Sequence, residues 1–245
     1  MLNYSEMTEL DQKLVALAST PVHTIPDVVA VFEAIENTVP TTDGLHWFNW
    51  LYLAVTKSVG ASMSTRQWNN PAWLERLDIV FGGLYLKGLR ECLRHDTGAP
   101  RCWHVFVNSR HDGRLARIQF AMAGMNAHIN HDLSAAVVET CRQMGLHPAH
   151  GSDIHSDFTQ VNELLENLID TAKRQLLVGL LGNVIPEIGK VEDQVAGLGI
   201  VASRELAWTN AEILWHVPSG LRDRFLAGLD RTTALVGKNL VTPIL

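Results

Sequence analysis

Residues 71–95 read PAWLERLDIVFGGLYLKGLRECLRH, a long helical pattern. A proline at the first position is typical of a helix N-terminus, and apolar residues follow it at helical spacing. The apolar positions cover more than one face of this helix: Leu74, Leu77, Ile79, Phe81, Leu84 and Leu89. Because a helix that is apolar on several faces has to be covered on all of them, the pattern predicts a deeply buried helix.

The segments before this helix show the same spacing. A helical pattern covers residues 6–18, and Pro26 opens a second helix. Thr42 and Asp43 can cap a third helix, LHWFNWLYLAVTKSV (45–59), and we expect Gly60 to end it.

The segments after this helix are also helical in pattern. RCWHVFVNS (101–109) fits a short helix or a strand, with the helix favoured. A helix is predicted over 114–144, with Gly145 as its end. Further helices are expected at DFTQVNELLENLIDTAKRQLL (157–177), at 191–216 and at 221–236. Period-two alternation, hairpin turns and flexible linkers are missing from the sequence. It therefore predicts one all-α domain over residues 1–245, a bundle of about eight helices.

The composition excludes several classes of protein. The 245 residues are 47% hydrophobic and 19% charged, and the net charge is -6. Nucleic-acid binding needs a basic surface that this balance does not provide. The N-terminal residues MLNYSEMTELDQK do not resemble a signal peptide, and no apolar run reaches the roughly 18 residues that span a bilayer. An odd number of cysteines, three, argues against a disulfide framework. We expect a soluble cytoplasmic protein, while the oligomeric state stays open.

The stretch AGMNAHINHDL (123–133) places polar side chains in the most apolar part of the chain. On a helix His128 and Asp132 form an i, i+4 pair and share a face, and His131 lies beside them. Asn126 and Asn130 form a second such pair on an adjacent strip. Because an unpaired buried polar group costs about 1–3 kcal/mol, we expect partners to face this cluster.

The nearest candidate partners follow in the loop LHPAHGSDIH and in the helix after it. Helices joined by a short loop are commonly antiparallel neighbours, so Asp157 could approach His128 and Asp132. Histidine nitrogens and carboxylate oxygens suit zinc, iron or manganese. The sequence therefore suggests a divalent metal held by His128, Asp132, Asp157 and His155.

Other interpretations of the same residues stay open. Asp157 could cap its own helix, and the histidines and asparagines could form a closed structural network. The HxxHD spacing is less specific than the HExxH zinc motif. The cluster could also form a metal-free acid–base or binding pocket. Asp78 and Trp50 are further candidates for contact with a substrate, and His46 and Glu205 could reach the same cavity.

AGMNAHINHDL resembles the signature of an uncharacterised bacterial family, a domain of unknown function. The resemblance continues through the segments DGLHWFNWLYLAVTKSV, LDIVFGGLYLKGLR, SDFTQVNELL and SRELAWTNAEILW. It implies an all-helical domain and a core motif made of Asn126, His128, Asn130 and Asp132. It also implies a downstream motif of Asp157 and Asn162. The resemblance also implies a basic residue, usually arginine, at the position where this chain has His131. This difference argues against His131 as an obligatory metal ligand.

We therefore expect a small-molecule enzyme with no nucleic-acid or membrane partner. His128, Asp132 and Asp157 would carry the chemistry, and Asn126, Asn130, Asp78 and Trp50 would contact the substrate. With a metal, the reaction would be hydrolysis by activated water. Without one, it would be acid–base isomerisation, elimination or cyclisation of a largely apolar substrate. The alternatives are a non-catalytic protein that binds an apolar small molecule and a structural helical protein.

Overall fold

The structure, a computed structural model, describes residues 7–176 and 199–243. It confirms the all-α prediction, and the described residues contain no strand. The helices are α1 (Glu9–Leu17), α2 (Ile25–Thr38), α3 (Gly44–Thr65), α4 (Pro71–Leu93), α5 (Arg101–Ser109), α6 (Arg117–Ala127), α7 (Leu133–Met144), α8 (Asp153–Leu176), α10 (Ile200–His216) and α11 (Ser219–Leu240). A π-helical segment, His128–Asp132, joins α6 to α7, so these three form one continuous helix.

The long helix α4 is buried as its pattern predicts. Pro71 occupies the first turn, and the Asn70 side chain accepts a hydrogen bond from the Trp73 backbone N–H at 3.0 Å. Trp73 and Tyr85 are completely buried on opposite parts of this helix. The helix contacts α1, α2, α3, α5, α7 and α8, and it therefore organises one hydrophobic core that draws on the whole chain.

A reciprocal glycine contact holds α3 close to α6. Gly44 of α3 lies against the ring of Phe120, and Gly124 of α6 lies against the ring of Phe48. A Cβ atom at Gly124 would stand 2.3 Å from the Phe48 ring, and one at Gly44 would stand 2.2 Å from Phe120. Only glycine permits this approach, which brings the aromatic face of α3 next to the polar cluster of the following turn.

The expected end of α3 at Gly60 is wrong. The helix continues to Thr65, and Asp43 caps its start by accepting a hydrogen bond from the Leu45 N–H at 2.9 Å. A glycine inside a helix costs only about 1 kcal/mol relative to alanine. At Gly60 the bare backbone lets Ile25 of α2 pack closely, because a Cβ atom there would lie 3.1 Å from its side chain.

The remaining helices agree with the predicted segments, with shifted ends. Residues 101–109 form α5, as favoured, and Gly145 ends α7 in the left-handed region with φ 66°. The last helix, α11, is longer at both ends than the predicted 221–236. The predicted helix over 191–216 is α10 from Ile200 onward, while its part over 191–198 lies outside the described residues.

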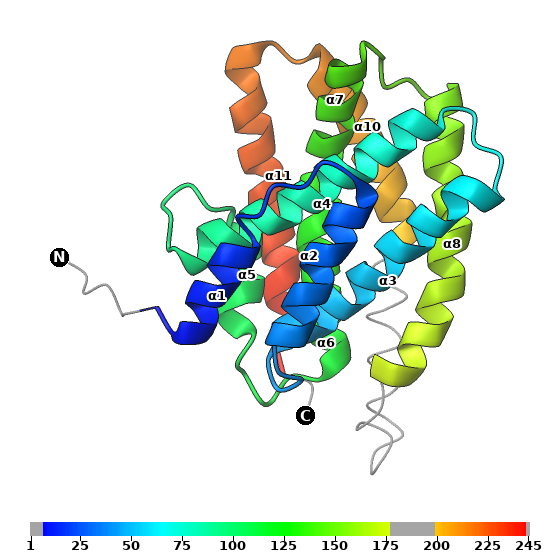
Figure 1. Cartoon of the computed structure of the whole chain (residues 1–245). Helices are drawn as coiled ribbons and strands as arrows, with labels where there is room; N and C mark the ends of the chain where they lie inside the picture. The colour runs from blue at the N-terminus through cyan, green and yellow to red at the C-terminus, as the bar shows by residue number, and fades with distance from the viewer. Residues whose placement is uncertain (1–6, 177–198, 244–245) are drawn as a thin grey trace.

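The helix α8 does not lie beside α7, although only a short loop joins them. It packs against α3 and α4 along one side of the bundle, and α10 is a principal neighbour of α7 (Figure 1). The expected approach of the start of α8 to the polar cluster through an antiparallel α7–α8 pair is therefore wrong.

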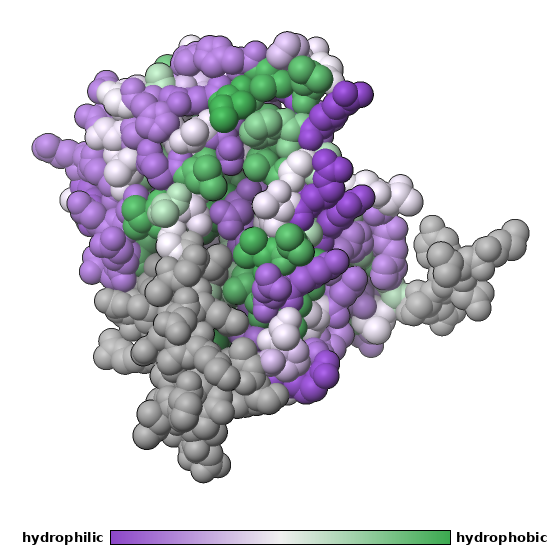
Figure 2. Space-filling view, turned by 180° about the vertical axis from the view of Figure 1, so that it is seen from behind, coloured by the Kyte–Doolittle hydropathy of each residue, from purple (hydrophilic) through white to green (hydrophobic). Residues whose placement is uncertain are grey.

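The surface of the bundle mixes polar and apolar side chains. Seen from behind, apolar areas alternate with polar ones (Figure 2). The exposed large apolar side chains belong to α10 and α11: Val201, Leu206, Ile213, Leu221, Leu235 and Val236. Among the described helices, none is both long and apolar enough to cross a membrane. The three cysteines, Cys92, Cys102 and Cys141, are buried free thiols.

Candidate functional site

The π-helical segment brings two histidines onto one carboxylate. The Leu133 N–H donates to the carbonyl of His128, five residues back. His128 Nδ1 lies 2.9 Å from Asp132 Oδ2, and His131 Nδ1 lies 2.6 Å from Asp132 Oδ1. Short π-helical segments within α-helices occur frequently at functional sites. The predicted pairing of His128 with Asp132 is thus present, in a helix geometry that the sequence did not indicate.

Asp132 is a fully engaged, ionised carboxylate. Its Oδ2 also accepts a hydrogen bond from Trp103 Nε1 at 3.0 Å. Burial favours the neutral acid, but the hydrogen bonds from His128 and His131 outweigh it and lower the pKa of Asp132. A tryptophan N–H can only donate and an ionised carboxylate can only accept, so Oδ2 accepts from both Trp103 and His128. This assigns the Nδ1–H tautomer to His128.

His128 is a neutral base inside an aromatic cage. Burial lowers its pKa, and the hydrogen bond to Asp132 only partly opposes that effect. The Phe81 ring stacks on the imidazole at 3.5 Å and 4°, and Tyr52 meets it edge-on at 4.6 Å. With Nδ1 bound to Asp132, Nε2 keeps its lone pair, and it has no hydrogen-bond partner among the described residues.

A small, mostly apolar cavity adjoins His128. The residues lining it come from α3, α4, α6, the π segment, α8 and α10: Phe48, Leu51, Tyr52, Val55, Phe81, Met125, His128, Ile129, Leu165, Leu168, Ile200 and Arg204. Its volume is about 50 Å³. One ordered water needs roughly 10–15 Å³ of such space, so the cavity suits a small molecule.

Of the further buried polar groups in this region, Tyr52 lines the cavity, whereas Thr56 and Asp78, the latter a predicted substrate contact, do not. The Tyr52 hydroxyl, the Thr56 hydroxyl and Asp78 Oδ2 are buried and have no hydrogen-bond partner in the described part of the chain. Burial raises the pKa of Asp78 to about 7. Burial and the nearby Asp78 carboxylate raise the pKa of Tyr52 well above its usual value, so its hydroxyl stays a hydrogen-bond donor.

Arg204 supplies the cavity wall with a buried cation. Its side chain donates from Nε to Asn162 Oδ1 and from Nη2 to the Phe158 carbonyl, both at 2.7 Å. The guanidinium also lies 4.2 Å from the centre of the Phe158 ring. Burial lowers the pKa of Arg204 to about 10, which still leaves it charged near pH 7.

The structure does not bring Asp157 to His128 and Asp132. Its Oδ1 accepts from the Asn69 backbone N–H and side chain, each at 2.9 Å, and its Oδ2 accepts from the Asn70 N–H at 2.6 Å. Asp157 thus closes the loop before α4 and has no oxygen left for the cluster. Asn162, the other residue of the downstream motif, holds Arg204.

The two asparagines of the core motif join the helix to α11. Asn130 Nδ2 donates to Asn126 Oδ1 at 3.0 Å, and Asn126 Nδ2 donates to the Thr233 carbonyl at 2.9 Å. Neither lines the cavity, and neither does Trp50, which packs partly buried against the core. His46 also points elsewhere and pairs with Glu36 at 3.3 Å. These residues hold helices together around the site.

The expected metal ligands do not converge on one point. Within the described residues, two groups of three potential ligands are close enough for one ion: Cys102, His131 and Asp230, and His150, His155 and Glu205. Neither contains His128, Asp132 or Asp157. His155 Nδ1 accepts from the Gly151 N–H at 3.1 Å, which leaves the ring proton on Nε2 facing Glu205 at 3.2 Å. His155 would have to lose this proton before Nε2 could hold a metal.

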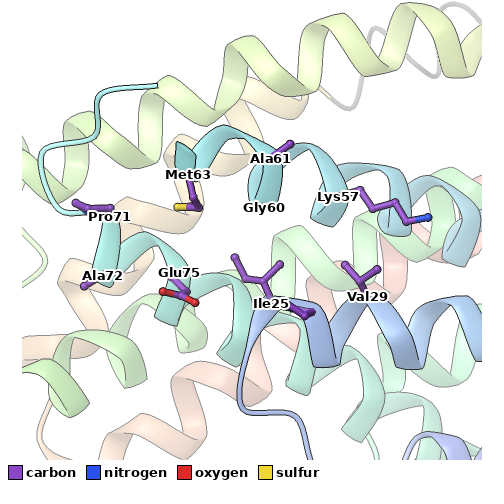
Figure 3. A pocket seen from close by; sticks show the side chains of 10 residues that line it. Ile25, Val29, Lys57, Gly60, Ala61, Met63, Pro71, Ala72 and Glu75 are labelled. Carbon is purple, nitrogen blue, oxygen red and sulfur yellow. The ribbon is translucent and has the colours of Figure 1, made fainter. Parts of the chain in front are cut away.

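A wider groove lies between the starts of α2 and α4 and the end of α3. The close view shows mostly apolar side chains, with the Lys57 ammonium and the Glu75 carboxylate apart from each other (Figure 3). Lys57 is paired with Glu33 at 2.7 Å. We place the candidate site at the smaller cavity instead, because two of its lining residues, His128 and Tyr52, have buried polar atoms without hydrogen-bond partners among the described residues.

Sequence reasoning missed Arg204, Tyr52 and Trp103. A signal existed for Arg204, since it stands four residues before Trp208 and seven before Ala211, in phase with the buried face of α10. An arginine in phase with a buried face has to find a buried partner or a ligand. Trp103 and Tyr52 are indistinguishable in sequence from ordinary core aromatics, and only the packing of α3, α5 and the π segment reveals them.

Comparisons with known proteins agree with an uncharacterised family. Residues 25–243 match the model described as "Family of unknown function (DUF5995)". No curated protein and no solved structure matches the chain. The match includes α2 and every described helix after it, with the polar cluster and the cavity. The chain therefore belongs to the DUF5995 family, whose function is unknown.

Proposed function

We propose that the protein is a small-molecule enzyme in which His128 acts as a general base on a largely apolar substrate. One observation carries the proposal. A buried imidazole is fixed by a carboxylate at Nδ1 and presents an unpaired Nε2 beside a cavity. An ordered base whose other nitrogen is held by a carboxylate is the arrangement that general base catalysis uses.

The surrounding groups fit proton transfer from carbon. His128 Nε2 would take a proton next to a substrate carbonyl, and the electrons of that C–H bond would move into an enolate. Asp132 would stabilise the imidazolium that forms. The Tyr52 hydroxyl, which burial keeps protonated, could donate a hydrogen bond to the enolate oxygen. Return of the proton to another carbon gives isomerisation, and loss of a leaving group gives elimination.

Metal-assisted hydrolysis finds less support at this site. The three acceptor contacts of Asp132 are already used by Trp103, His128 and His131. A metal on His128 Nε2 would need further ligands from the cavity wall, which is mainly aromatic and aliphatic. The cavity would also serve a protein that binds an apolar molecule without turnover, which is the second candidate function.

Deuterium exchange tests the proposed step without knowledge of the physiological substrate. The protein would be incubated in deuterated water with small apolar ketones and keto acids, and loss of the α-proton signal would be followed by NMR. We expect His128→Gln to slow exchange by about 10²–10⁴-fold, the usual contribution of a general base.

His46→Gln is the matched control. His46 lies on the aromatic helix α3 and also pairs with a carboxylate, that of Glu36, but it does not line the cavity. Its loss should therefore leave exchange unchanged. Equal exchange in wild type and His128→Gln would refute the proposal. Binding of the same compounds without exchange would support the binding protein instead.

A further inference from the structure

The cavity wall carries a positive charge that forms no ion pair with a carboxylate of the described residues. Arg204 is 6% exposed, and its hydrogen-bond partners are neutral oxygens of Asn162 and Phe158. The adjacent carboxylate, Glu205, is engaged by His150 and His155. A buried charge is normally paired with an opposite charge, because moving an unpaired charge from water into the protein interior costs free energy.

We infer that Arg204 is the anchor for the carboxylate group of a small, mostly apolar substrate. This inference rests on the proposed function and names the substrate class for the same cavity. A guanidinium has five N–H donors, and Arg204 uses two of them, on Nε and Nη2. The remaining three belong to the Nη1–Nη2 edge, the planar fork that binds a carboxylate through two parallel hydrogen bonds.

The surroundings select the kind of anion. One guanidinium balances one negative charge, so a carboxylate leaves the cavity neutral. A phosphate dianion would leave an extra negative charge near the ionised Asp132. The rest of the lining is aromatic or aliphatic apart from His128 and the Tyr52 hydroxyl. An apolar body with a single carboxylate therefore fits, with its body against Phe81 and Phe48 and its reacting carbon toward His128.

Matched pairs of ligands test the anchor separately from catalysis. Propionate and butyrate, which match the small volume of the cavity, would be titrated into the full chain beside propionamide and butyramide, with binding measured by calorimetry. The amides keep size and shape but remove the charge. In the wild type we expect each carboxylate to bind about ten-fold or more tightly than its amide, as a charge-assisted pair allows.

Three variants separate the two proposals. Arg204→Met should reduce the carboxylate-to-amide affinity ratio to about one, whereas Arg204→Lys should keep part of it as a point charge. His128→Gln should keep the full ratio, because it removes the base and leaves the anchor. The affinity ratio thus tests the role of Arg204 alone, while deuterium exchange tests the role of His128.

If Arg204→Met does not fold, the carboxylate and amide affinities of the wild type are sufficient to refute the inference. Equal affinities for acid and amide, or binding of neither carboxylate, would show that Arg204 is not a carboxylate anchor. An unchanged ratio in a folded Arg204→Met would show that another group supplies the preference.

Discussion

Two buried arginines of this molecule have opposite surroundings. Arg110, at the end of α5, is 3% exposed and pairs with Asp11 of α1 and with Asp43, whose Oδ2 lies 3.3 Å from its Nε. Arg204 is similarly buried but has only neutral acceptors among the described residues. Both have an Nη1 without a hydrogen-bond partner, so the difference lies in charge rather than in the number of contacts.

The comparison separates a charge that holds helices together from one available to a ligand. At Arg110 two aspartates from two other segments meet one cation, and removal of the arginine leaves the buried Asp43 without this ion pair. At the cavity, the Arg204 guanidinium without a carboxylate partner and the unpaired His128 Nε2 are polar groups buried without full compensation. Asp78, which does not line the cavity, is a third such group, with a pKa raised by burial to about 7. Proteins keep such groups where function needs them.

The largest expected difference is in stability. Arg110→Met should cost about 3–5 kcal/mol of unfolding free energy, because it leaves buried carboxylates unpaired. Arg204→Met should cost about 2 kcal/mol less than that, because it removes an uncompensated charge and strands only neutral acceptors. Urea denaturation of both variants measures the difference. Equal costs would mean that the charge of Arg204 is as fully compensated as that of Arg110, contrary to the difference described above.

Asp78, a third buried polar group, should show its cost through pH. Its pKa rises on folding from 3.8 to about 7, so the folded state binds more protons and stability falls as pH rises through that window. Asp78→Asn should therefore stabilise the protein by about 2 kcal/mol at pH 8 and change little at pH 4. Thermal unfolding at the two pH values tests this. Stabilisation of the same size at both would point to packing instead of ionisation.

The smallest expected effect belongs to the two histidines. The pKa of His128 is lowered by burial, so its contribution to stability is present above pH 6.5 and is lost as the pH falls below it. The pKa of His131 is raised, since its bond to Asp132 outweighs burial. Its contribution is present below pH 6.5 and is lost as the pH rises through the folded value.

NMR titration of the imidazole nitrogens can check both directions and the tautomer. His128 should keep its Nδ1 proton and titrate below 6.5, and His131 should titrate above it. A His128 that carries its proton on Nε2 would contradict the assigned hydrogen bond to Asp132. His128→Gln should remove the loss of stability in acid.

The helices were predictable because each depends on local pattern. Asn70 with Pro71 starts α4, and Gly145 ends α7, through contacts within a few residues. The predicted helix end at Gly60 was wrong because the role of this glycine is to let Ile25 of α2 pack closely, which is a contact between helices. The spacing of apolar residues along the sequence does not indicate which helices pack beside one another around α4.

The site was predictable only in part for the same reason. His128 and Asp132 lie four residues apart, so one helix suffices to pair them. Asp157 was a plausible third member by chain proximity, but the loop before α4 returns to bind it. Arg204 comes from α10, which approaches the π segment only in the folded chain.

The π segment makes the length of the chain between α6 and α7 important for the site. An i→i+5 hydrogen bond accommodates one residue more than an α-helical turn does. Deletion of Ile129 would let α6 and α7 close into an uninterrupted α-helix, with no broken backbone bond to reveal the loss. The helices on both sides would keep their faces, because the π segment absorbs the extra residue, but the spacing of His128 and Asp132 would shorten from four residues to three and change the geometry that pairs them. A relative lacking one residue here could keep the whole bundle and have no paired base, so alignment length across 128–132 distinguishes relatives more sharply than overall identity does.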